Sequence, residues 1–277
     1  MKLLNGKELA DKIKDEVKSY IEAHQLDVSL AVIQVGDNPA SNTYVRNKER
    51  ACKYCGIDSV VYRFDENIEE EQLLRFIRNR NQPNDVNGIL VQLPLPKHID
   101  EDKIIQAIAP EKDVDGFHEI NVGKLMIGED TFVPCTAAGI IELLEHNNIE
   151  IEGKNCVVVG RSNIVGKPTA IELLHRNGTV TVCHSKTKNL KEICRAADIL
   201  VCAIGKPKFF NREYVGQGTV VIDVGIHRQE DGTLCGDVDF EDVKDIVGAI
   251  TPVPGGVGVC TIAMLMKNCV KAAQMQM

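Results

Sequence analysis

Residues 156–168 read CVVVGRSNIVGKP, and this stretch decides the fold of the second half of the chain. An apolar run enters a turn with two glycines, after which Pro168 suits the first turn of a helix. A turn without side chains lets the backbone approach a pyrophosphate, whose charge is favoured by the N–H groups and dipole of a helix start. Ser162 replaces the second glycine of G-x-G-x-x-G, and the last glycine is displaced. Taken alone, the stretch leaves a dinucleotide site and an ordinary tight turn both open.

The end of the next predicted strand bears on which dinucleotide would bind. In NAD sites this strand ends in an acid that accepts the ribose hydroxyls, but here it ends in Cys183-His184-Ser185-Lys186. An acid would repel an additional phosphate, and these residues would not. Arg161 adds a guanidinium that can hold the extra phosphate of NADP through paired charge-assisted bonds. NADP is therefore favoured over NAD, although Arg161 and Lys186 could also be solvated surface charges.

Strand and helix patterns alternate along the whole chain, which predicts an α/β fold with mostly parallel sheets. Apolar runs predict strands at residues 29–35, 59–64, 88–91, 156–159, 179–183, 199–203 and 219–223. Helical spacing predicts a first helix that buries Leu9, Ile13, Val17 and Ile21, and further helices at 42–55, 68–80, 100–109, 136–147, 168–177, 190–196 and 261–273.

The chain of 277 residues is long enough for two domains, each with its own core. Residues 1–118 are predicted to form the first domain and residues 119–277 the second, which resembles a doubly wound nucleotide-binding domain. Residues 110–128 have the texture of a loop and form the predicted junction. The C-terminal helix, at about 261–277, can pack back on the first domain.

Composition narrows the class of protein. A hydrophobic content of 44% and a charged content of 26% are typical of soluble globular proteins. The net charge of -8 argues against nucleic acid as a partner, and no apolar stretch predicts a membrane span or a secretory signal. Most of the ten cysteines lie in apolar runs, so we expect reduced thiols and a cytoplasmic protein. The pair Cys52 and Cys55 has no second pair to complete a metal site, so packing is its expected role.

Polar residues follow three predicted strands of the first domain, at the sheet edge where α/β proteins bind ligands. Tyr44 and Lys48 lie one turn apart on a helix that Ser41 is expected to cap. Gln92 follows the third strand, and residues 110–117 combine Asp113 and Asp115 with a glycine turn. Each feature has an ordinary alternative, since Lys48 could be an exposed amine and either aspartate could simply cap a turn.

Five stretches together resemble the bifunctional methylenetetrahydrofolate dehydrogenase/cyclohydrolase family. They are SNTYVRNK (41–48), QLPLP (92–96), PEKDVDGF (110–117), GRS (160–162) and PGGVG (254–258). They occur in the order of the family and span nearly the whole chain. The resemblance implies an N-terminal parallel-sheet catalytic domain and a C-terminal Rossmann-type domain. It also implies a folate cleft between the domains, a homodimer through the second domain, and no metal.

The resemblance implies roles for individual residues as well. In the folate site, Tyr44 would stack on the pterin, Asp115 would grip its amino-pyrimidine edge, and Gln92 would position Lys48 for catalysis. The remaining substrate contacts would come from Pro254, Gly255 and Gly256, and the NADP contacts from Gly160, Arg161, Ser162, Ser185 and Ile226.

The implied activity is oxidation of methylenetetrahydrofolate with NADP, followed by hydrolysis of the methenyl product to formyltetrahydrofolate. Hydride transfer requires mainly positioning, because the reactivity belongs to the nicotinamide. In the hydrolysis a partly desolvated ammonium can move a proton, and Lys48 is the candidate. The family implies one-carbon metabolism linked to purine, histidine and methionine synthesis.

Two departures from the family pattern lie beside the expected folate cleft. Val259-Cys260 stands where Pro-Met is common, and Ala137 stands where proline is usual, which relaxes the backbone at two helix starts. Two other classes of protein share some of these features. A shikimate dehydrogenase-like enzyme would also use lysine and aspartate in a cleft, and a non-catalytic nucleotide-binding protein would explain the Gly160 turn alone.

Overall fold

The computed structural model describes residues 1–277, with the exception of the side chain of Ala40. The chain forms two compact units. Residues 1–10 and 134–261 make one, which we call the six-stranded unit, and residues 11–133 and 262–277 make the other, the three-stranded unit. The C-terminal residues thus belong with most of the N-terminal half. The domain limits drawn at residue 118 stay a prediction.

The three-stranded unit contains most of α1 (Gly6–His24) and α10 (Val257–Met275). Its other elements are β2 (Ser29–Val35), α2 (Pro39–Cys55), β3 (Asp58–Phe64), α3 (Glu70–Arg80), β4 (Gly88–Val91), α4 (Glu101–Gln106), the 3-10 helix η1 (Pro110–Lys112) and α5 (Glu119–Ile127).

The six-stranded unit contains β1 (Lys2–Leu3), α6 (Cys135–His146), β5 (Asn155–Val159), α7 (Gly166–His175), β6 (Thr179–Cys183), α8 (Leu190–Arg195) and β7 (Ile199–Cys202). It continues with the 3-10 helix η2 (Arg212–Tyr214), β8 (Val220–Asp223), β9 (His227–Arg228), β10 (Leu234–Cys235), α9 (Phe240–Val243) and β11 (Ala249–Ile250).

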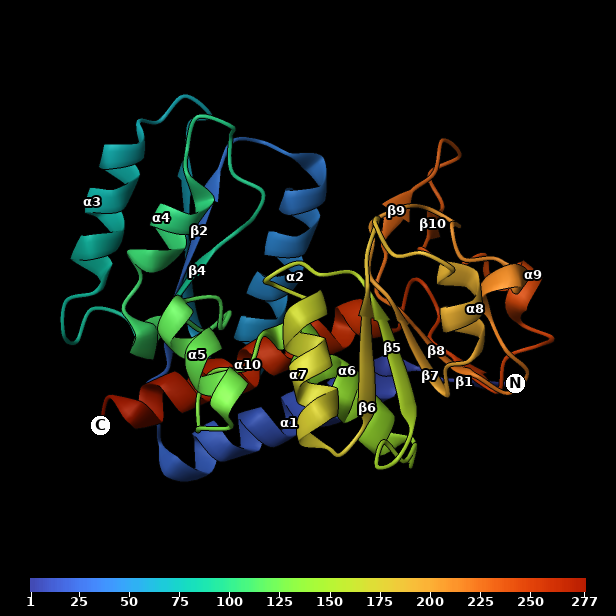
Figure 1. Ribbon diagram of the computed structural model, residues 1–277. Coiled ribbons are helices and arrows are strands. Elements are labelled where there is room, and N and C mark those ends of the chain that lie inside the picture. The colour runs from blue at the N-terminus through green and yellow to red at the C-terminus, as the bar shows by residue number, and fades with distance from the viewer. The chain divides into compact units, whose positions relative to one another are not determined.

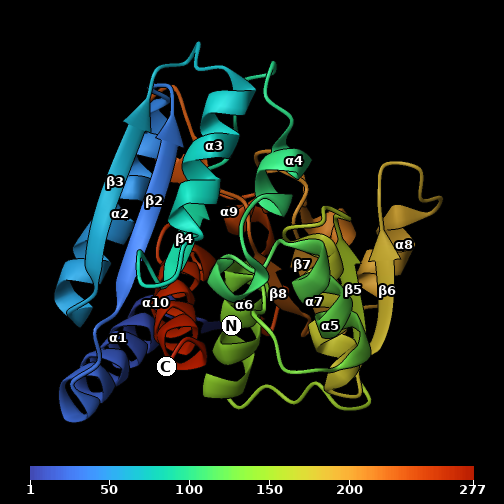
Figure 2. The same ribbon diagram turned by 90° about the vertical axis from the view of Figure 1, so that its left-hand side faces the viewer.

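The sheet of the three-stranded unit is parallel, in the order β3-β2-β4. β2 is buried along its apolar length, as the unbroken run of residues 29–35 predicts for a central strand covered on both faces. Residues from α3 and α4, including Leu73, Ile77 and Ile104, form a core with Ile33 and Ile89 of the strands. α2 lies on the opposite face of the sheet (Figure 2).

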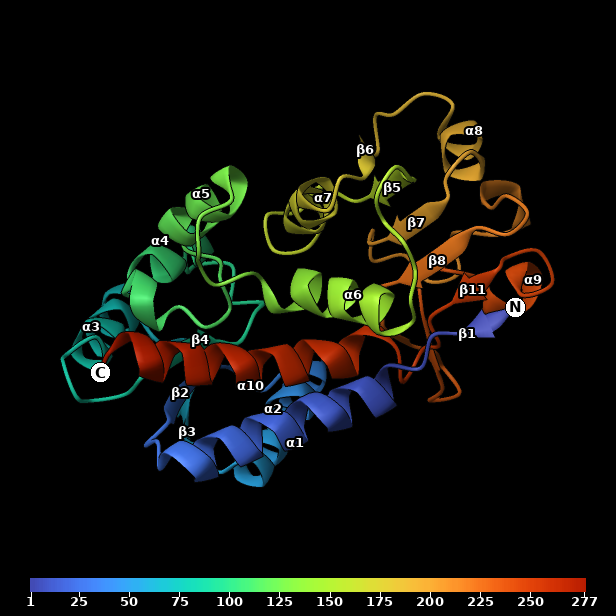
Figure 3. The same ribbon diagram turned by 90° about the horizontal axis from the view of Figure 1, so that it is seen from below.

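α1 and α10 run side by side in the three-stranded unit (Figures 1 and 3). The predicted stripe of α1 is confirmed, because Leu9, Ile13, Val17 and Ile21 are all buried. The amide Nε2 of Gln274 donates to the hydroxyl of Tyr20 at 2.6 Å near the end of this pair.

The sheet of the six-stranded unit has the order β1-β11-β8-β7-β5-β6, and all of its pairings are parallel. α6 and α7 lie on one face, while α8 and α9 lie on the other (Figure 3). The N-terminal strand β1 completes this sheet by pairing with β11. Two-residue strands carry too little pattern to be predicted from sequence.

One helix was not expected. Residues 110–128 were predicted as a loop, but α5 occupies Glu119–Ile127. His118 caps it, because its ring Nδ1 accepts a hydrogen bond from the N–H of Ile120 at 3.1 Å. Gly128 ends it with a left-handed φ of 78°. The prediction was wrong because a histidine cap is not among the usual helix-start residues.

Two helices begin three or more residues earlier than predicted. α2 begins at Pro39, so Ser41 lies inside the helix and does not cap it. Proline suits a first helical position, where its missing N–H costs nothing. α10 begins at Val257 instead of Thr261, and thus includes Gly258 of the stretch PGGVG. The predicted end of α2 is confirmed, since Gly56 has a φ of 80°.

The cysteine pair on α2 is buried. Burial raises the pKa of the Cys52 thiol to about 12 and that of Cys55 to about 11, so neither forms a thiolate readily. Among the described residues, no cluster of three or more His, Cys, Asp or Glu side chains is arranged to hold a metal ion. The described helices include none with the length and apolar character needed to cross a membrane.

Candidate active site

Four strand ends of the six-stranded unit line up at one edge of the sheet. Val159 of β5 pairs with Cys183 of β6 and Cys202 of β7, and Cys202 pairs with Asp223 of β8. The residues that follow these strands therefore start in a row. Ligands of open parallel sheets bind at this carboxyl edge, so the row is the expected cofactor side of the unit.

The Gly160 turn is too tight for any other residue. A Cβ on Gly160 would lie 2.2 Å from the carbonyl oxygen of Ala203, and φ is 138° there. A Cβ on Gly166 would lie 2.2 Å from the carbonyl oxygen of Gly160. Gly166, the displaced last glycine of the pattern, therefore lies where the start of α7 packs against the turn. Ser162 Oγ accepts from the N–H groups of Val165 and Gly166 at 3.2 and 3.3 Å, which closes the turn.

The side chains suited to phosphate surround this turn. Arg161, Ser162, Ser185 and Lys186 are all exposed at the edge after β5 and β6. His184 holds the second loop, since its N–H donates to Thr187 Oγ1 at 2.9 Å and its ring Nδ1 accepts from the N–H of Lys186 at 3.1 Å. Bare backbone at Gly160 with cations and hydroxyls beside it fits a phosphorylated dinucleotide.

Lys48 lies at the carboxyl edge of the three-stranded sheet and is not an exposed amine. Only 8% of it is exposed, and its Nζ donates to Gln92 Oε1 at 3.1 Å. Gln92 is held at both ends of its side chain, because Nε2 donates to the carbonyl of Leu93 at 2.8 Å. Its own N–H donates to Ile33 O at 2.8 Å, which continues the pairing of β4 with β2. The sheet register therefore fixes the position of the lysine ammonium.

The two aspartates of residues 110–117 have different environments. Asp113 is fully buried, and its carboxylate accepts from the N–H of Gly116 at 3.1 Å, the N–H of His118 at 2.8 Å and Asn121 Nδ2 at 2.9 Å. A bridge to Ile89 ties this residue to β4. Asp113 therefore shapes the loop, while the half-buried Asp115 is carried at its turn.

The carboxyl of Asp115 and the ammonium of Lys48 interact. Burial raises the pKa of Asp115 to about 6, against the opposing effect of the Lys48 charge, and the Asp113 charge raises it further. Tyr44, one turn before Lys48 on α2, is half-buried, and burial raises the pKa of its hydroxyl. This edge thus offers a carboxylate, an ammonium, an amide and an aromatic ring within one unit.

Other predicted site residues belong to the six-stranded unit. Pro254, Gly255 and Gly256 form the turn before α10, where Gly255 has a φ of 103° and its carbonyl accepts from the N–H of Gly6 at 2.8 Å. Ile226 follows β8 and is 38% exposed. The ligand contacts assigned to these residues stay predictions.

Sequence reasoning missed the residues that support both edges. Asn121 holds Asp113, and the buried Asp223 and Asp237 accept many backbone hydrogen bonds after β7 and β8. A sequence signal for these aspartates was available, because a glycine lies close to each of them: Gly225 near Asp223 and Gly236 beside Asp237. The two departures are simple packing residues: Ala137 and Cys260 are buried, and burial raises the pKa of the Cys260 thiol to about 12.

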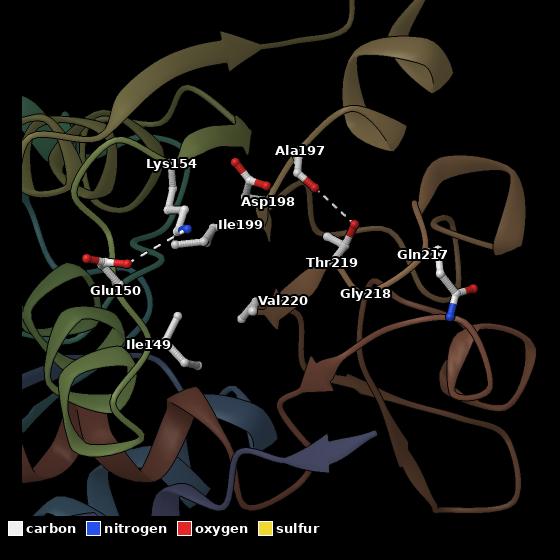
Figure 4. Close-up of a pocket in the computed structure, with 10 residues that line it drawn as sticks. All are labelled: Ile149, Glu150, Lys154, Ala197, Asp198, Ile199, Gln217, Gly218, Thr219 and Val220. Carbon is white, nitrogen blue, oxygen red and sulfur yellow. Dashed lines mark hydrogen bonds and ion pairs between the residues drawn. The ribbon is translucent and has the colours of Figure 1, made fainter.

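A cavity of about 370 Å³ lies at the opposite edge of the six-stranded sheet, where β7 and β8 begin (Figure 4). Several of its polar groups have partners: Lys154 pairs with Glu150 at 3.8 Å, and Thr219 Oγ1 donates to Ala197 O at 3.0 Å. This amino-terminal edge is not where open parallel sheets bind ligands. We assign no ligand to it.

The fold and the two sets of edge residues define a two-domain α/β enzyme of the dinucleotide-binding class. Residues 4–115 match the model of the tetrahydrofolate dehydrogenase/cyclohydrolase catalytic domain, and residues 134–277 match its NAD(P)-binding domain. The bifunctional protein FolD of Lachnoclostridium phytofermentans is 60% identical over 275 residues, with 98% of each chain covered.

Two solved structures are similar over nearly the whole chain. Bifunctional FolD from Campylobacter jejuni has a TM-score of 0.96 at 50% identity, with 100% of both chains covered. The Trypanosoma brucei methylenetetrahydrofolate dehydrogenase-cyclohydrolase, in complex with NADP cofactor and inhibitor, has a TM-score of 0.94 at 37% identity. The match covers 99% of this chain and 97% of the Trypanosoma brucei chain.

The chain belongs to the tetrahydrofolate dehydrogenase/cyclohydrolase family. It is a bifunctional enzyme of one-carbon folate metabolism, both an oxidoreductase and a hydrolase. The predicted family, fold class and double activity are confirmed. The shikimate dehydrogenase-like and non-catalytic alternatives are set aside, because both halves match the same folate family.

If the folate contact that the family resemblance implies for Asp115 is made, the raised pKa of Asp115 predicts an acid limit for folate binding. Only the ionised carboxylate accepts two donors, so affinity for a reduced folate should fall about tenfold per pH unit below pH 6. In Lys48→Met the limit should move to higher pH, because the Lys48 charge lowers the pKa of Asp115. Calorimetric titrations from pH 5 to 8 measure the folate affinity of wild type and of Lys48→Met. If the affinity of both proteins falls below the same pH, the Lys48–Asp115 interaction is contradicted.

Proposed function

We propose that Tyr44, Lys48, Gln92 and Asp115 form one folate site that serves both reactions, with Lys48 as the proton-transfer residue. The observation that carries this proposal is the buried Lys48 ammonium, fixed by Gln92 and interacting with Asp115. A surface lysine has neither constraint. Burying an ammonium is costly unless it is paired, so this arrangement requires compensating partners.

The pterin would bind between the aromatic and acidic groups. The Asp115 carboxylate can accept two parallel N–H donors from the amino-pyrimidine edge, and such paired bonds fix the orientation of a planar ring. The Tyr44 ring can cover the pterin face. Asp113 supports this geometry by holding the loop of Asp115 through three hydrogen bonds.

In the dehydrogenase step the bound nicotinamide supplies a hydride acceptor. A C–H bond of the methylene group breaks, its electron pair leaves with the hydrogen, and the carbon becomes the methenyl cation. No side chain has to accept or release a proton here. The contribution of Tyr44 and Asp115 is to hold the carbon in a reactive position.

In the cyclohydrolase step water attacks the methenyl carbon and a C–O bond forms. The water loses its first proton as it adds. A C–N bond of the tetrahedral intermediate then breaks, the new hydroxyl loses the second proton to become the formyl carbonyl, and the departing ring nitrogen gains one proton. One proton is released overall. Lys48 would move the proton between oxygen and nitrogen, and Gln92 would keep its Nζ in place through the 3.1 Å hydrogen bond.

We propose NADP as the preferred cofactor. Gly160 provides bare backbone for the pyrophosphate, and Arg161 with Ser185 would hold the additional phosphate. Ser162 would contribute mainly by closing the turn, since its Oγ accepts two backbone N–H groups. Ile226, exposed after β8, would contact the cofactor. No acid follows β6 in the sequence to favour NAD.

We also propose a homodimer through β6. This strand is one of the two outer strands of the six-stranded sheet, and its Val182 is 40% exposed. Leu174 of α7, the helix before it, is 55% exposed. An exposed edge strand with apolar neighbours is suited to pair with a second copy.

A cytoplasmic location completes the proposal. The thiols of Cys156, Cys202 and Cys260 are buried and reduced, as is usual in compartments that do not form disulfides.

Replacing Lys48 by methionine should lower cyclohydrolase kcat by about 10² to 10⁴-fold, the range lost with a general acid–base group. The dehydrogenase should lose much less, because its chemical step moves no proton through Lys48. The matched control is Lys53→Met, an exposed lysine on the same helix, which should leave both rates unchanged. Hydrolysis at the wild-type rate in folded Lys48→Met would rule out the proposed role.

Replacing Arg161 by alanine should raise the KM for NADP on the order of tenfold or more, with little change in the KM for NAD. Arg195→Ala, in an exposed position on α8, is the control and should change neither constant. Steady-state dehydrogenase kinetics with each cofactor give the comparison. Equal losses with both cofactors would show that Arg161 does not contact the extra phosphate.

Replacing Val182 by lysine should weaken the dimer, because two like charges would approach across the paired strands. Light scattering over a dilution series would then show a monomer at concentrations where the wild type is a dimer. Val60→Lys, on exposed β3 of the other unit, should leave the mass unchanged. A wild-type dimer that Val182→Lys does not affect would place the interface elsewhere.

A further inference from the structure

Two buried carboxylates hold loops at the carboxyl edge of the six-stranded sheet, where the cofactor is expected. The proposed mechanism uses neither of them. Asp223 ends β8, and Asp237 follows the short strand β10. Asp237 is 0% exposed, and Asp223 is also buried. A buried charge has to be compensated, so the groups that surround each carboxylate show what it holds in place.

Asp237 collects three successive backbone N–H groups from the loop after β7. Its Oδ2 accepts from Ile204 at 2.7 Å and from Gly205 at 2.9 Å, and its Oδ1 accepts from Lys206 at 2.9 Å. Gly205 has a φ of 68°, which lets the three N–H groups converge. Such a concave arrangement of N–H groups normally binds an anion, and here the anion is a side chain of the same unit.

The same carboxylate also holds the loop after β8. The ring Nε2 of His227 donates to Asp237 Oδ1 at 2.8 Å. On the other side of Ile226, the N–H of Gly225 donates to Asp223 Oδ1 at 3.0 Å. Ile226, which we propose as a cofactor contact, is therefore flanked by two residues that bind these carboxylates.

Asp223 fixes the backbone of Asp237 itself. Its carboxylate accepts from the N–H of Asp237 at 2.8 Å and from the N–H of Val238 at 3.0 Å. The packing leaves no room for side chains: a Cβ on Gly225 would lie 2.4 Å from Asp237 Oδ1, and one on Gly236 would lie 1.8 Å from Asp223 Oδ2. The glycines that accompany the two aspartates are thus explained by the carboxylates they contact.

The loop held by Asp237 adjoins the Gly160 turn. Ala203 N–H donates to Val159 O at 2.9 Å, and the Ala203 carbonyl lies where a Cβ on Gly160 would clash. Ile204 follows Ala203 directly, so a shift of residues 204–206 would change the backbone beside the phosphate-binding turn. Asp237 therefore acts on the loops after β7 and β8 together, and on the Gly160 turn through Ala203.

We propose that Asp237 is a positioning residue for the dinucleotide, which holds residues 204–206 and Ile226 in the conformation that binds it. This inference rests on the proposed use of NADP. Asp237 is not among the residues of the proposed folate site, and it is not a catalytic residue. Its loss should therefore damage the step that uses the cofactor and spare the step that does not.

The test compares Asp237→Asn with wild type in both reactions. Asparagine keeps the shape but presents an NH₂ group to N–H donors, so part of the network breaks. We expect the KM for NADP to rise on the order of tenfold, while hydrolysis of methenyltetrahydrofolate without NADP stays within about twofold of wild type. Asp239→Asn removes the same charge two residues away and should change neither quantity.

His227→Gln serves if Asp237→Asn does not fold, because it removes only the bond to Nε2. It should produce a smaller rise in the KM for NADP, again with hydrolysis retained. An unchanged KM for NADP in the folded variants, or an equal loss of both activities, would overturn the positioning role. A wild-type enzyme that does not use NADP would instead contradict the proposed cofactor, so the two failures are distinguishable.

Discussion

The hydrogen bond from Lys48 Nζ to Gln92 Oε1 joins two elements 44 residues apart in sequence. It exists because β2 and β4 are neighbours in a parallel sheet, so the helix after one strand and the loop after the other start at the same edge. Without this constraint Lys48 would be one more lysine on a charged helix. With it, the amine is removed from water and pointed at a fixed acceptor beside the Asp115 carboxyl.

The same geometric rule produces the cofactor edge. Parallel register places the Gly160 turn, the His184 loop and the loops after β7 and β8 in one row. In both units a partly exposed residue that we propose to contact ligand, Asp115 or Ile226, lies in a loop that a fully buried carboxylate holds. Asp113 does this for Asp115, and Asp237 does it for residues 204–206. Each buried charge is stabilised by hydrogen bonds from backbone N–H groups of a loop. The same hydrogen bonds hold that loop in place.

Much of this arrangement could be predicted from sequence, because strong local patterns decide it. The apolar runs of β2 and β5 and the buried stripe of α1 are clear local patterns. The family resemblance rests on the motifs around Lys48, Gln92 and Asp115. What could not be predicted depends on distant partners. β1 is a strand only because β11 lies beside it, and α5 depends on a histidine cap. Asp237 has no local pattern of its own, since its three N–H donors come from residues more than thirty positions away.

The division of roles between Asp113 and Asp115 has the same origin. Both occur in one short loop, and sequence alone left either as a turn residue. The structure separates them because Asn121, on the unexpected helix α5, reaches back to Asp113. The family resemblance selected Asp115 as the ligand-binding residue, and the burial of Asp113 gives a physical reason for that choice.

The central claim is that Gln92 acts on hydrolysis through Lys48, and a double-mutant cycle tests it most directly. Cyclohydrolase kcat would be measured for wild type, Lys48→Met, Gln92→Met and the double variant, with folding checked by circular dichroism. If Gln92 only holds the amine, the double variant should be no slower than Lys48→Met alone. Losses that multiply in the double variant would show that the two residues act independently, which would contradict the account.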